Sequence, residues 1–528
     1  SVTGYLQIGG LIGKNDPGTV SNCFWDTETS GQSSSAGGTG KTNSDMQDYN
    51  TFTDENTSGL TSAWDFVTDP NDDSGTNDYW DMDQKGTVND YYPILSWQDG
   101  ADGLLEPPYS GGIGTSDDPY QIATTDDLIE LSNTSGDWDK YFIQTADIAF
   151  NADKPQVDLE GDGSAGGSGK SGFSPIGNYT TTFTGSYNGQ EHSITGLTID
   201  RSSDSNIGMF GYNSGTIDNV HLYDIDVNGA TKVGGLVGEN NDGSVSNCSS
   251  SGNVNGDWCG GLVGWNNDGT VSNSSSSGSV NGNDELGGLV GRSTDGGTVS
   301  NSGSSSVVTG ENAVGGLLGY NEGPTSNSNS SGNVTGDFGV GGLVGVNLGS
   351  VSNCYSTGAV SRNNDSTAET FGAFCGMNGY EEPGKQSFPG GHVSYCYATG
   401  DVVYGNATNP TDKGFVGYDY NADYTANFFD SEASNQNSDT AGAATAKSTA
   451  EMQNSETFSD SDWTIGERDD IEKGYPFLAW EIDENGEKNP VWLIGTGNPA
   501  AVPLSNMALF LGMLLISGFV FLKVYRIN

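Results

Sequence analysis

The stretch Val233-Gly-Gly-Leu-Val-Gly238 is followed by Ser244-Val-Ser-Asn247 and Gly252-Asn-Val254, and close variants of this unit recur as far as Val360. Its paired glycines return at a spacing of 26 to 28 residues, at Gly234, Gly260, Gly287, Gly315 and Gly341. A period in this range is typical of a solenoid. Each unit has too few apolar residues to bury a core alone, so the units must stack.

Apolar residues recur at fixed positions of the unit. If each unit is one coil of a parallel β-solenoid, every such column becomes a ladder inside the stack, with about 4.8 Å between rungs. The three columns are Val245, Val271, Val299 and Val351; Val254, Val280, Val308, Val334 and Val360; and Leu236, Leu262, Leu289, Leu317 and Leu343. Because Leu236 and Val237 are adjacent, strict alternation would send one of them outward unless the backbone bends.

A fourth column consists of asparagines at one turn position. Asparagine tolerates a left-handed backbone, and its amide can bond to the coils above and below, so we expect an amide ladder. The column comprises Asn247, Asn273, Asn301, Asn327 and Asn353.

These tandem runs, each Gly-Leu-Val-Gly followed by Thr/Ser-Val-Ser-Asn, resemble the GLUG repeat of bacterial and archaeal surface proteins. The segment from Phe173 to Ile199 is similar to the entry coils of large adhesin-like chains. The resemblance implies an all-β fold, a right-handed parallel β-helix with short capping helices, on the cell surface. It implies no particular activity.

A second repeat covers more of the chain. Phe24-Trp-Asp-Thr-Glu28, Lys41 to Asp54 and Tyr92 to Trp97 return as Phe428-Phe-Asp-Ser-Glu432, Lys447 to Asp460 and Tyr475 to Trp480. These are two copies of one terminating block. Each carries a capping-box pattern, and we expect its helix to cover the open end of a solenoid. Since only one repeat precedes the first copy, that copy is interpreted as the end of a truncated module.

The predicted domains follow from these repeats. They are a truncated module at 1–98, a linker at 99–112, a cap with entry coils at 113–232, five repeats at 233–362, longer coils with loops at 363–432, a terminating block at 433–482, a linker with sorting motif at 483–503, a transmembrane helix at 504–522 and a basic tail at 523–528.

The C-terminal segment 504–522 is apolar enough and long enough to span a membrane as a helix. Lys523 and Arg526 follow it and place the preceding chain outside the cell. With this helix and basic tail, the motif Val502, Pro503, Leu504 and Ser505 resembles the sorting signals cut by exosortase or archaeosortase enzymes, which would be partners. The motif departs from the Ile-Pro-Thr-Leu variant, and a plain membrane anchor is the alternative.

Composition restricts the partners. The chain has 69 acidic and 18 basic residues and a net charge of −51, which excludes nucleic acid as a natural partner. Asp158, Glu160 and Asp162 resemble the start of a calcium-binding loop, although Gly169 stands where its closing acid belongs. Calcium is therefore a candidate ligand, solvated acidic loops are the alternative, and no cofactor is required.

Catalytic residues are hard to assemble from the sequence. The histidines are His192, His221 and His392, and none lies in a nucleophile motif. Basic residues of the repeats are limited to Lys232, Arg292 and Arg362, and no two of them share a column. We therefore favour a structural or adhesive surface protein over an anchored carbohydrate-active β-helix enzyme. Trp258, Trp265 and Tyr320 are candidates for stacking on sugar rings, with packing as the alternative.

Cysteines provide a test of register. Cys354 and Cys396 occupy one column in successive coils, so their α-carbons should lie about 5 Å apart. They are a candidate disulfide, although in-register parallel strands hold β-carbons too far apart for an unstrained bridge. Cys259 and Cys375 replace apolar columns and should be buried.

Overall fold

A computed structural model of the chain describes residues 9–15, 19–54, 56–64, 66, 80–82, 92–95, 109–150, 171–294, 296–363, 368–381, 387–405, 407–439, 441–472, 474–481 and 491–497. The chain forms two compact units, residues 1–109 and 110–528.

The first unit is small and rich in aromatic residues. Strand β1 (Phe24–Asp26) pairs in parallel with β2 (Thr39–Lys41), and β3 (Trp80–Met82) pairs antiparallel with β4 (Pro93–Leu95). In its described residues the helices are α1 (Thr27–Ser30), α2 (Asn43–Met46) and α3 (Asn50–Thr53). Phe24, Phe52, Leu60 and Phe66 form the core of this unit.

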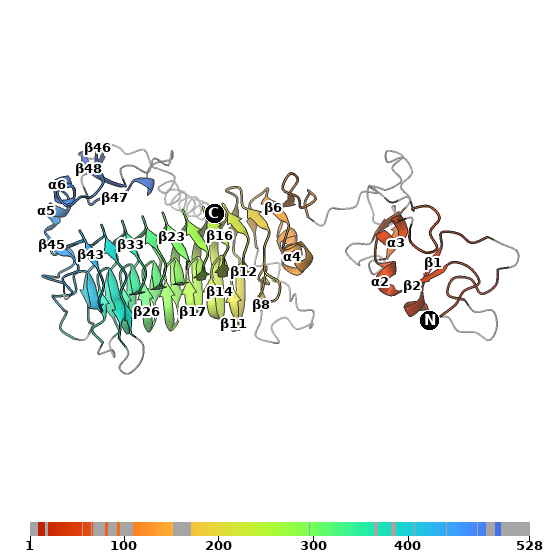
Figure 1. Ribbon diagram of the computed structural model, residues 1–528, viewed down its shortest axis with the longest axis horizontal. Coiled ribbons are helices and arrows are strands. Elements are labelled where there is room, and N and C mark those ends of the chain that lie inside the picture. The colour runs from red at the N-terminus through yellow and green to blue at the C-terminus, as the bar shows by residue number, and fades with distance from the viewer. Residues whose placement is uncertain are drawn as a thin grey trace, which may run out of the picture. The chain divides into compact units, whose positions relative to one another are not determined.

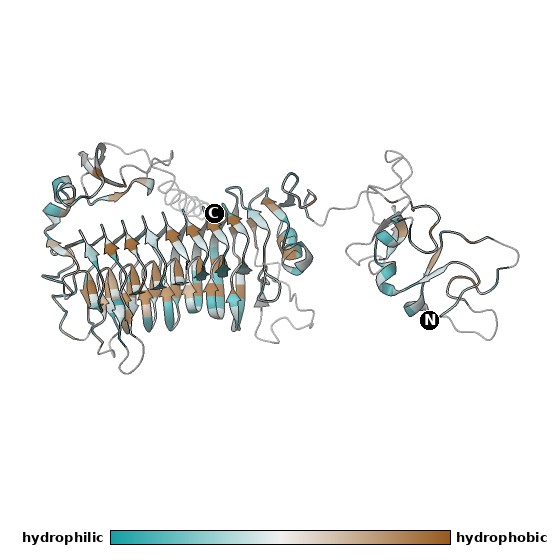
Figure 2. Ribbon diagram, in the orientation of Figure 1, coloured by the Kyte–Doolittle hydropathy of each residue, from teal (hydrophilic) through white to brown (hydrophobic). Residues whose placement is uncertain are grey.

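The second unit is a parallel β-solenoid built from three sheets (Figure 1). The sheets are numbered 1 to 3 below, and their strands are counted over the described residues. Along one coil the chain passes through sheet 3, then sheet 1, then sheet 2, and returns to sheet 3. Figure 2 shows apolar positions repeated from strand to strand along the stack. The fold is therefore the all-β solenoid that the repeats predict.

Sheet 1 has 11 strands: β5 (Tyr120–Ile122), β6 (Tyr141–Gln144), β9 (Ser186–Asn188), β13 (Thr216–Asp218), β16 (Ser244–Ser246), β19 (Thr270–Ser272), β23 (Thr298–Ser300), β28 (Thr325–Ser326), β33 (Val351–Ser352), β39 (Val393–Ser394) and β43 (Tyr424–Thr425). Sheet 3 has 9 strands: β12 (Phe210–Asn213), β15 (Val237–Asn241), β18 (Val263–Asn267), β22 (Val290–Thr294), β27 (Leu318–Asn321), β32 (Val344–Asn347), β37 (Cys375–Tyr380), β38 (Phe388–Pro389) and β42 (Val416–Asp419).

Sheet 2 has 21 strands, because bends divide this side of each coil: β7 (Ile148–Ala149), β8 (Ser171–Gly172), β10 (Ser193–Thr195), β11 (Thr198–Ile207), β14 (His221–Gly234), β17 (Ser249–Gly260), β20 (Ser275–Asn281), β21 (Asp284–Gly287), β24 (Gly303–Ser304), β25 (Val307–Thr309), β26 (Asn312–Gly315), β29 (Asn329–Ser330), β30 (Val334–Gly336), β31 (Phe338–Gly341), β34 (Tyr355–Ser356), β35 (Val360–Arg362), β36 (Phe371–Gly372), β40 (Tyr397–Ala398), β41 (Val402–Val403), β44 (Phe428–Asp430) and β45 (Thr445–Lys447).

The predicted apolar columns are confirmed as ladders. Val245 pairs with Val271, and Val254 pairs with Val280, in the registers of sheets 1 and 2. Leu236 and Val237 are both fully buried, because β14 ends at Gly234 and β15 begins at Val237. The bend between these strands turns both side chains inward.

Glycine is required at this bend. A Cβ atom on Gly234 would lie 2.1 Å from the carbonyl oxygen of Val237. The backbone of the next coil is also too close, since the same atom would lie 2.7 Å from the Leu262 oxygen. The paired glycines that define the repeat therefore allow the coils to approach one another.

The turn asparagines all adopt the predicted left-handed backbone, with φ between 47° and 53° in Asn247, Asn273, Asn301, Asn327 and Asn353. Their amides form only part of a ladder. Asn301 Nδ2 donates to Asn273 Oδ1 over 3.2 Å, whereas Asn247 Nδ2 donates to Asp218 Oδ1 over 2.8 Å.

A more regular amide ladder lies inside sheet 3, and sequence reasoning missed it. Its members are fully buried, and they are Asn213, Asn240, Asn266, Asn321, Asn347 and Asn378. Asn213 donates to Asn240 over 2.7 Å, and Asn240 donates to Asn266 over 2.8 Å. Each buried amide thus gains a partner in the next coil, which offsets the cost of removing it from water.

A helix lies in the predicted cap at 113–232. Helix α4 (Thr125–Asn133) has a capping box between Thr124 and Asp127, and its Leu128 and Leu131 are buried. The 3₁₀ turn η2 (Ser135–Asp137) follows it. Figure 1 shows α4 at the end of the stack beside β6.

The opposite end is covered differently from our expectation. A loop covers the exposed N–H groups of the last coil: Asp439 Oδ1 accepts hydrogen bonds from Phe415 N and Val416 N, and Gln436 Oε1 accepts one from Lys413 N. The expected helix forms as α5 (Thr449–Met452), which starts at a capping box between Ser448 and Glu451, and a second helix, α6 (Ser455–Ser459), follows it. They belong to a block that packs on the side of the stack.

We call this the flank block, residues 448–481 and 491–497. It contains a three-stranded sheet in the order β46 (Ile465–Glu472), β48 (Trp492–Gly497), β47 (Phe477–Leu478), and the 3₁₀ turn η3 (Ala479–Glu481). The predicted linker 483–503 therefore contributes the central strand of this sheet. Trp492 is fully buried, in a cluster with Tyr397, Phe428 and Trp463.

Hydrogen bonds fasten the flank block to four successive coils. Trp480 Nε1 donates to Asn327 O, Tyr355 OH to Glu481 Oε2, Tyr397 OH to Pro476 O and Trp463 Nε1 to Ala426 O, over 2.7, 2.9, 2.6 and 2.8 Å. Because these partners step along the solenoid axis, the block fastens the sides of neighbouring coils together.

Within the described ranges, no helix has the length and apolar character needed to cross a membrane. The predicted transmembrane helix 504–522, the basic tail and the motif Val502, Pro503, Leu504 and Ser505 lie outside those ranges, as do Lys523 and Arg526. Asp158, Glu160 and Asp162 lie outside them as well.

Candidate functional site: an aromatic and ionic stripe on sheet 3

The outward side chains of sheet 3 form a column along the solenoid. Strand register aligns them in successive coils, in the order Tyr212, Glu239, Trp265, Arg292, Tyr320, Val346, Met377 and Tyr418. Two of the three predicted stacking residues, Trp265 and Tyr320, belong to this column and lie two coils apart.

A second column lies beside the first, seven residues earlier in each coil. Its members adopt a left-handed backbone with φ between 47° and 64°, and they are Lys232, Trp258, Glu285, Ala313 and Gly339. The third predicted stacking residue, Trp258, belongs here, and its ring meets that of Trp265 edge to face at 5.7 Å. We call the two columns together the stripe.

Two ion pairs cross the stripe. Lys232 Nζ lies 2.7 Å from Glu239 Oε2, and Arg292 Nη1 lies 2.8 Å from Glu285 Oε1. Sequence reasoning noted that Lys232 and Arg292 share no column. The structure shows that their columns are neighbours, so both cations lie on one face.

Each cation also packs on aromatic rings. Lys232 Nζ lies 4.1 Å from the centre of the Trp265 ring, and the Arg292 guanidinium carbon lies 4.6 Å from Tyr320 and 5.3 Å from Trp258. Such contacts stabilise a partly desolvated cation by about 1 to 2 kcal/mol each. The rings therefore serve packing within the protein, and only part of each indole remains accessible.

Accessibility differs along the stripe. Trp258 and Trp265 are half-buried, whereas Tyr320 is only 9% exposed and donates its hydroxyl to Glu322 Oε1. Among the described residues, the most accessible ring beside these columns is Tyr179, which is 82% exposed and contacts Tyr212 edge to face at 6.1 Å, so we count it with the stripe. Sequence reasoning missed Tyr179, although it follows the turn residue Asn178, whose side chain accepts the N–H groups of Thr180 and Thr181.

Burial shifts the pKa values of two groups in the middle of the stripe. Burial raises the pKa of Glu285, the Arg292 guanidinium opposes that shift, and the charge of Glu322 adds to it. Burial also raises the pKa of Tyr320. Glu285 is thus a carboxyl, paired with Arg292, whose proton is held more firmly than in water.

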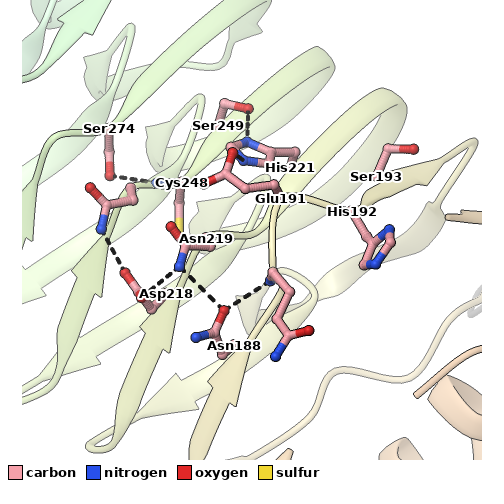
Figure 3. A network of polar contacts seen from close by, with 12 residues as sticks. Asn188, Glu191, His192, Ser193, Asp218, Asn219, His221, Cys248, Ser249 and Ser274 are labelled. Atoms are coloured by element: carbon pink, nitrogen blue, oxygen red, sulfur yellow. Dashed lines mark hydrogen bonds and ion pairs between the residues drawn. The ribbon is translucent and has the colours of Figure 1, made fainter. Parts of the chain in front are cut away.

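A second polar cluster surrounds His221 on sheets 1 and 2 (Figure 3). His221 Nδ1 lies 2.8 Å from Ser249 Oγ, and its Nε2 lies 3.2 Å from Glu191 Oε2. Ser, His and Glu therefore meet here as in a nucleophilic triad, an arrangement that only strand register reveals. The amide of Ser249, however, donates to Val220 O within the sheet and cannot stabilise an oxyanion.

The other residues of this cluster complete a surface network. Asp218 Oδ1 accepts hydrogen bonds from Ser246 Oγ and Asn247 Nδ2, and His192 Nδ1 lies 3.5 Å from Asp147 Oδ1. His192 follows a turn, where its N–H donates to Gly189 O. Among the described residues, no group of three or more His, Cys, Asp or Glu side chains is arranged to hold a metal ion.

The cysteines lie where the columns predict. Cys354 N donates to Cys396 Sγ over 3.4 Å, and the adjoining Tyr355 and Tyr397 are register partners, so the two thiols occupy successive coils. Both are free and buried. Cys259 and Cys375 are also buried, and desolvation raises the pKa of each thiol.

Two segments of the chain, residues 229–255 and 336–361, match the GLUG motif. A stretch of 150 residues, 28% of this chain and 2% of the relative, is 36% identical to halomucin of Haloquadratum walsbyi. Another of 146 residues, 27% of this chain and 15% of the relative, is 31% identical to a proposed Gly-rich membrane protein of Evansella cellulosilytica. The chain thus spans a small part of the length of either relative.

One solved structure covers 71% of the chain, with 20% identity and a TM-score of 0.42: a proposed immunoglobulin A1 protease from Bacteroides ovatus, 96% of which is aligned. The chain thus contains GLUG motifs, folds as a β-solenoid and is similar over part of its length to proteins named as halomucin and a membrane protein.

Proposed function

We propose that this chain is a structural and adhesive protein of the cell surface that presents its stripe to extracellular glycans. The observation that supports this most strongly is the long stack, in which registered strands of the described residues run from β5 to β45. A stack of this kind offers long, regular faces rather than a single closed site. The GLUG motifs and the similarity to halomucin support a surface location.

Attachment at the C-terminus is part of this proposal. The apolar segment 504–522 would hold the chain in the membrane, and an exosortase-type or archaeosortase-type enzyme would cut near Val502, Pro503, Leu504 and Ser505. Intact-mass measurement of protein from the native host tests this step. Loss of the peptide from Met507 to Arg526 supports processing, and its retention supports a permanent anchor.

Glycans are proposed because partly accessible indole and phenol rings lie in line along one face. Sugar rings present apolar faces that stack on aromatic side chains. The test is glycan-array binding of the full chain with and without calcium, which also examines the proposed ligands Asp158, Glu160 and Asp162. We expect Trp265→Ala and Tyr179→Ala to reduce binding at least tenfold.

Tyr141→Ala is the matched control, because Tyr141 is 45% exposed but lies on β6 of sheet 1, away from the stripe. Equal loss of binding in the control and in the stripe variants would contradict a role for the stripe. Retention of full binding by both stripe variants would also contradict it.

One observation favours the alternative function, an anchored carbohydrate-active enzyme. Glu285 combines a raised pKa with a neighbouring Arg292 and the nearby carboxylate of Glu322, a set of groups suited to general acid catalysis. Incubation with polysaccharides and measurement of new reducing or unsaturated ends tests this function. Activity that disappears in Glu285→Gln would establish it in place of adhesion alone.

A further inference from the structure

The two terminating blocks of this chain share one hydrogen-bonded framework. Trp64 Nε1 donates to Asn22 O over 3.1 Å in the first unit, and Trp463 Nε1 donates to Ala426 O over 2.8 Å in the flank block. Asp26 Oδ1 accepts from the amides of Glu28 and Thr29, as Asp430 Oδ1 does from those of Glu432 and Ala433. Tyr92 and Tyr475 donate their hydroxyls to Oδ2 of the respective aspartates.

A second tryptophan fills the same place in both blocks. Trp80 lies against Trp64 with ring centres 4.4 Å apart, and Trp492 lies against Trp463 at 4.8 Å. The interplanar angles, 36° and 39°, are also alike.

Backbone register confirms that the two places are equivalent. Trp80 forms a parallel bridge with Phe66 and an antiparallel pair with Leu95. Trp492 pairs in parallel with Ile465 and antiparallel with Leu478. Phe66 and Ile465 each follow the first tryptophan by two residues, and Leu95 and Leu478 each follow the Tyr-Pro step by two.

The order of these strands along the chain differs between the two blocks. In the first unit the tryptophan strand, β3, precedes the Tyr92-Pro93 step, whereas in the flank block it is β48, which follows Tyr475-Pro476. The same position between two strands is therefore filled by an earlier part of the chain in the first unit and by a later part in the flank block. The position recognises the strand itself and does not require a particular connection to it.

We infer that the position between β46 and β47 accepts β48 from a second copy of this chain, so that neighbouring molecules exchange strands. Exchange keeps every contact of the closed block and changes only the connection, which makes it a low-cost route to association. Main-chain hydrogen bonds to β46 and β47 supply affinity, and the aromatic cluster around Trp463 in which Trp492 packs supplies specificity.

The connection within one chain competes with exchange. Between Glu481 and Val491 lie nine residues, which hold β48 near its own block at an effective concentration of the order of millimolar. Exchange is therefore expected between molecules crowded on a surface, or when tension on the C-terminus withdraws β48 from its own block. In dilute solution the closed form should dominate.

A disulfide trap tests the inference with the full chain. Phe477 and Leu493 are antiparallel register partners, so cysteines at these positions lie within bonding distance. Phe477→Cys is prepared in one sample and Leu493→Cys in another, and the two are mixed at high concentration and oxidised. A double variant carrying both cysteines in one chain measures closure within the block, and Phe477→Ser mixed with Leu493→Cys is the matched control.

We expect the mixture to yield a disulfide-linked dimer whose cross-linked peptide joins positions 477 and 493, at least tenfold above the control. The dimer should increase with protein concentration. Closure of the bond in the double variant, together with a mixture no more dimeric than the control after warming to just below the unfolding midpoint, would overturn the inference.

Discussion

The repeated coils and the flank block bury their residues by different means. In the coils, most inward side chains meet their own kind in the next coil, as Val245 meets Val271 and Asn240 meets Asn266. In the flank block, unlike residues distant in sequence meet once, as Trp480 meets Asn327 and Trp492 meets Tyr355. The coils should therefore tolerate local damage, whereas the block should depend on a few large side chains.

The largest expected effect is that of Trp492→Ala. Trp492 is fully buried between Trp463, Tyr355 and Tyr397, so its truncation should cost the flank block about 3 to 5 kcal/mol. Amide hydrogen exchange should accelerate in residues 448–497 and remain slow at Val271 and Val280. Trp258→Ala is a matched control outside the block. Accelerated exchange throughout the coils would contradict the separation of the two regions.

The second expected effect depends on pH. Burial raises the pKa of Glu481 to about 7, against hydrogen bonds from Leu478 N and Tyr355 OH that lower it. Its folded pKa thus exceeds its unfolded value, so docking is most stable below that unfolded value and weakens as the pH rises to about 7. A shift of this size corresponds to about 3 kcal/mol, the integral of proton linkage.

Melting curves of the flank block, monitored by tryptophan fluorescence between pH 4 and pH 8, measure this dependence. Glu481→Gln should remove most of it, because the amide does not ionise. A pH dependence of the same size in Glu481→Gln would assign it to other groups.

The amide ladder gives a smaller effect within the coils. Asn266→Ala removes the acceptor of Asn240 and the donor to Gly269 O, and leaves buried polar groups without partners. The expected loss is about 1 to 3 kcal/mol, confined to neighbouring coils. Asn267→Ala is the control, because the side chain of Asn267 is part-buried and donates to Asn241 Oδ1 outside the ladder. Equal loss in both variants would show that burial of the ladder is unimportant.

The smallest effect concerns the stripe. Lys232→Met keeps the aliphatic contact with Trp265 but removes the ion pair with Glu239 and the cation over the ring. We expect a loss of about 1 kcal/mol in chemical denaturation. Glu239 is 4% exposed, so the double variant Lys232→Met with Glu239→Gln should recover part of that loss. If the double variant recovers no stability, the unpaired Glu239 carboxylate does not lower the free energy of unfolding.

The sequence predicted the features that recur in every coil, but it left open those that depend on a single local contact. The valine and leucine columns were recoverable because a fixed period places identical residues in register, and the left-handed turn at Asn247 follows from its residue type. The bend that buries both Leu236 and Val237 could be stated only as an alternative. The buried ladder through Asn240 was missed because the adjacent Asn241 is equally polar and the outward residue beside them changes in every coil.

Sequence could not show which surface the terminating block covers. Tyr355 and Tyr397 take outward positions that smaller residues, Ser249 and Ser275, occupy in earlier coils, and a single chain does not show what packs on them. The meeting of His221 with Ser249 and Glu191 likewise depends on register between distant strands. For the stripe, sequence supplied the aromatic residues and the cations Lys232 and Arg292, but it did not show that their columns are neighbours.

The central claim is that coils and flank block are two regions with separate stabilities, joined along the side of the stack. Residue-resolved hydrogen exchange of the unmodified chain at pH 5 and pH 8 tests it most directly. We predict that ladder amides of residues 233–362 exchange slowly at both values, whereas those of β46 and β48 exchange faster and are more protected at pH 5. The compared quantity is the protection factor, the ratio of the exchange rate of an unfolded chain to the observed rate at the same pH. Equal protection factors in both regions, unchanged between pH 5 and pH 8, would contradict the account.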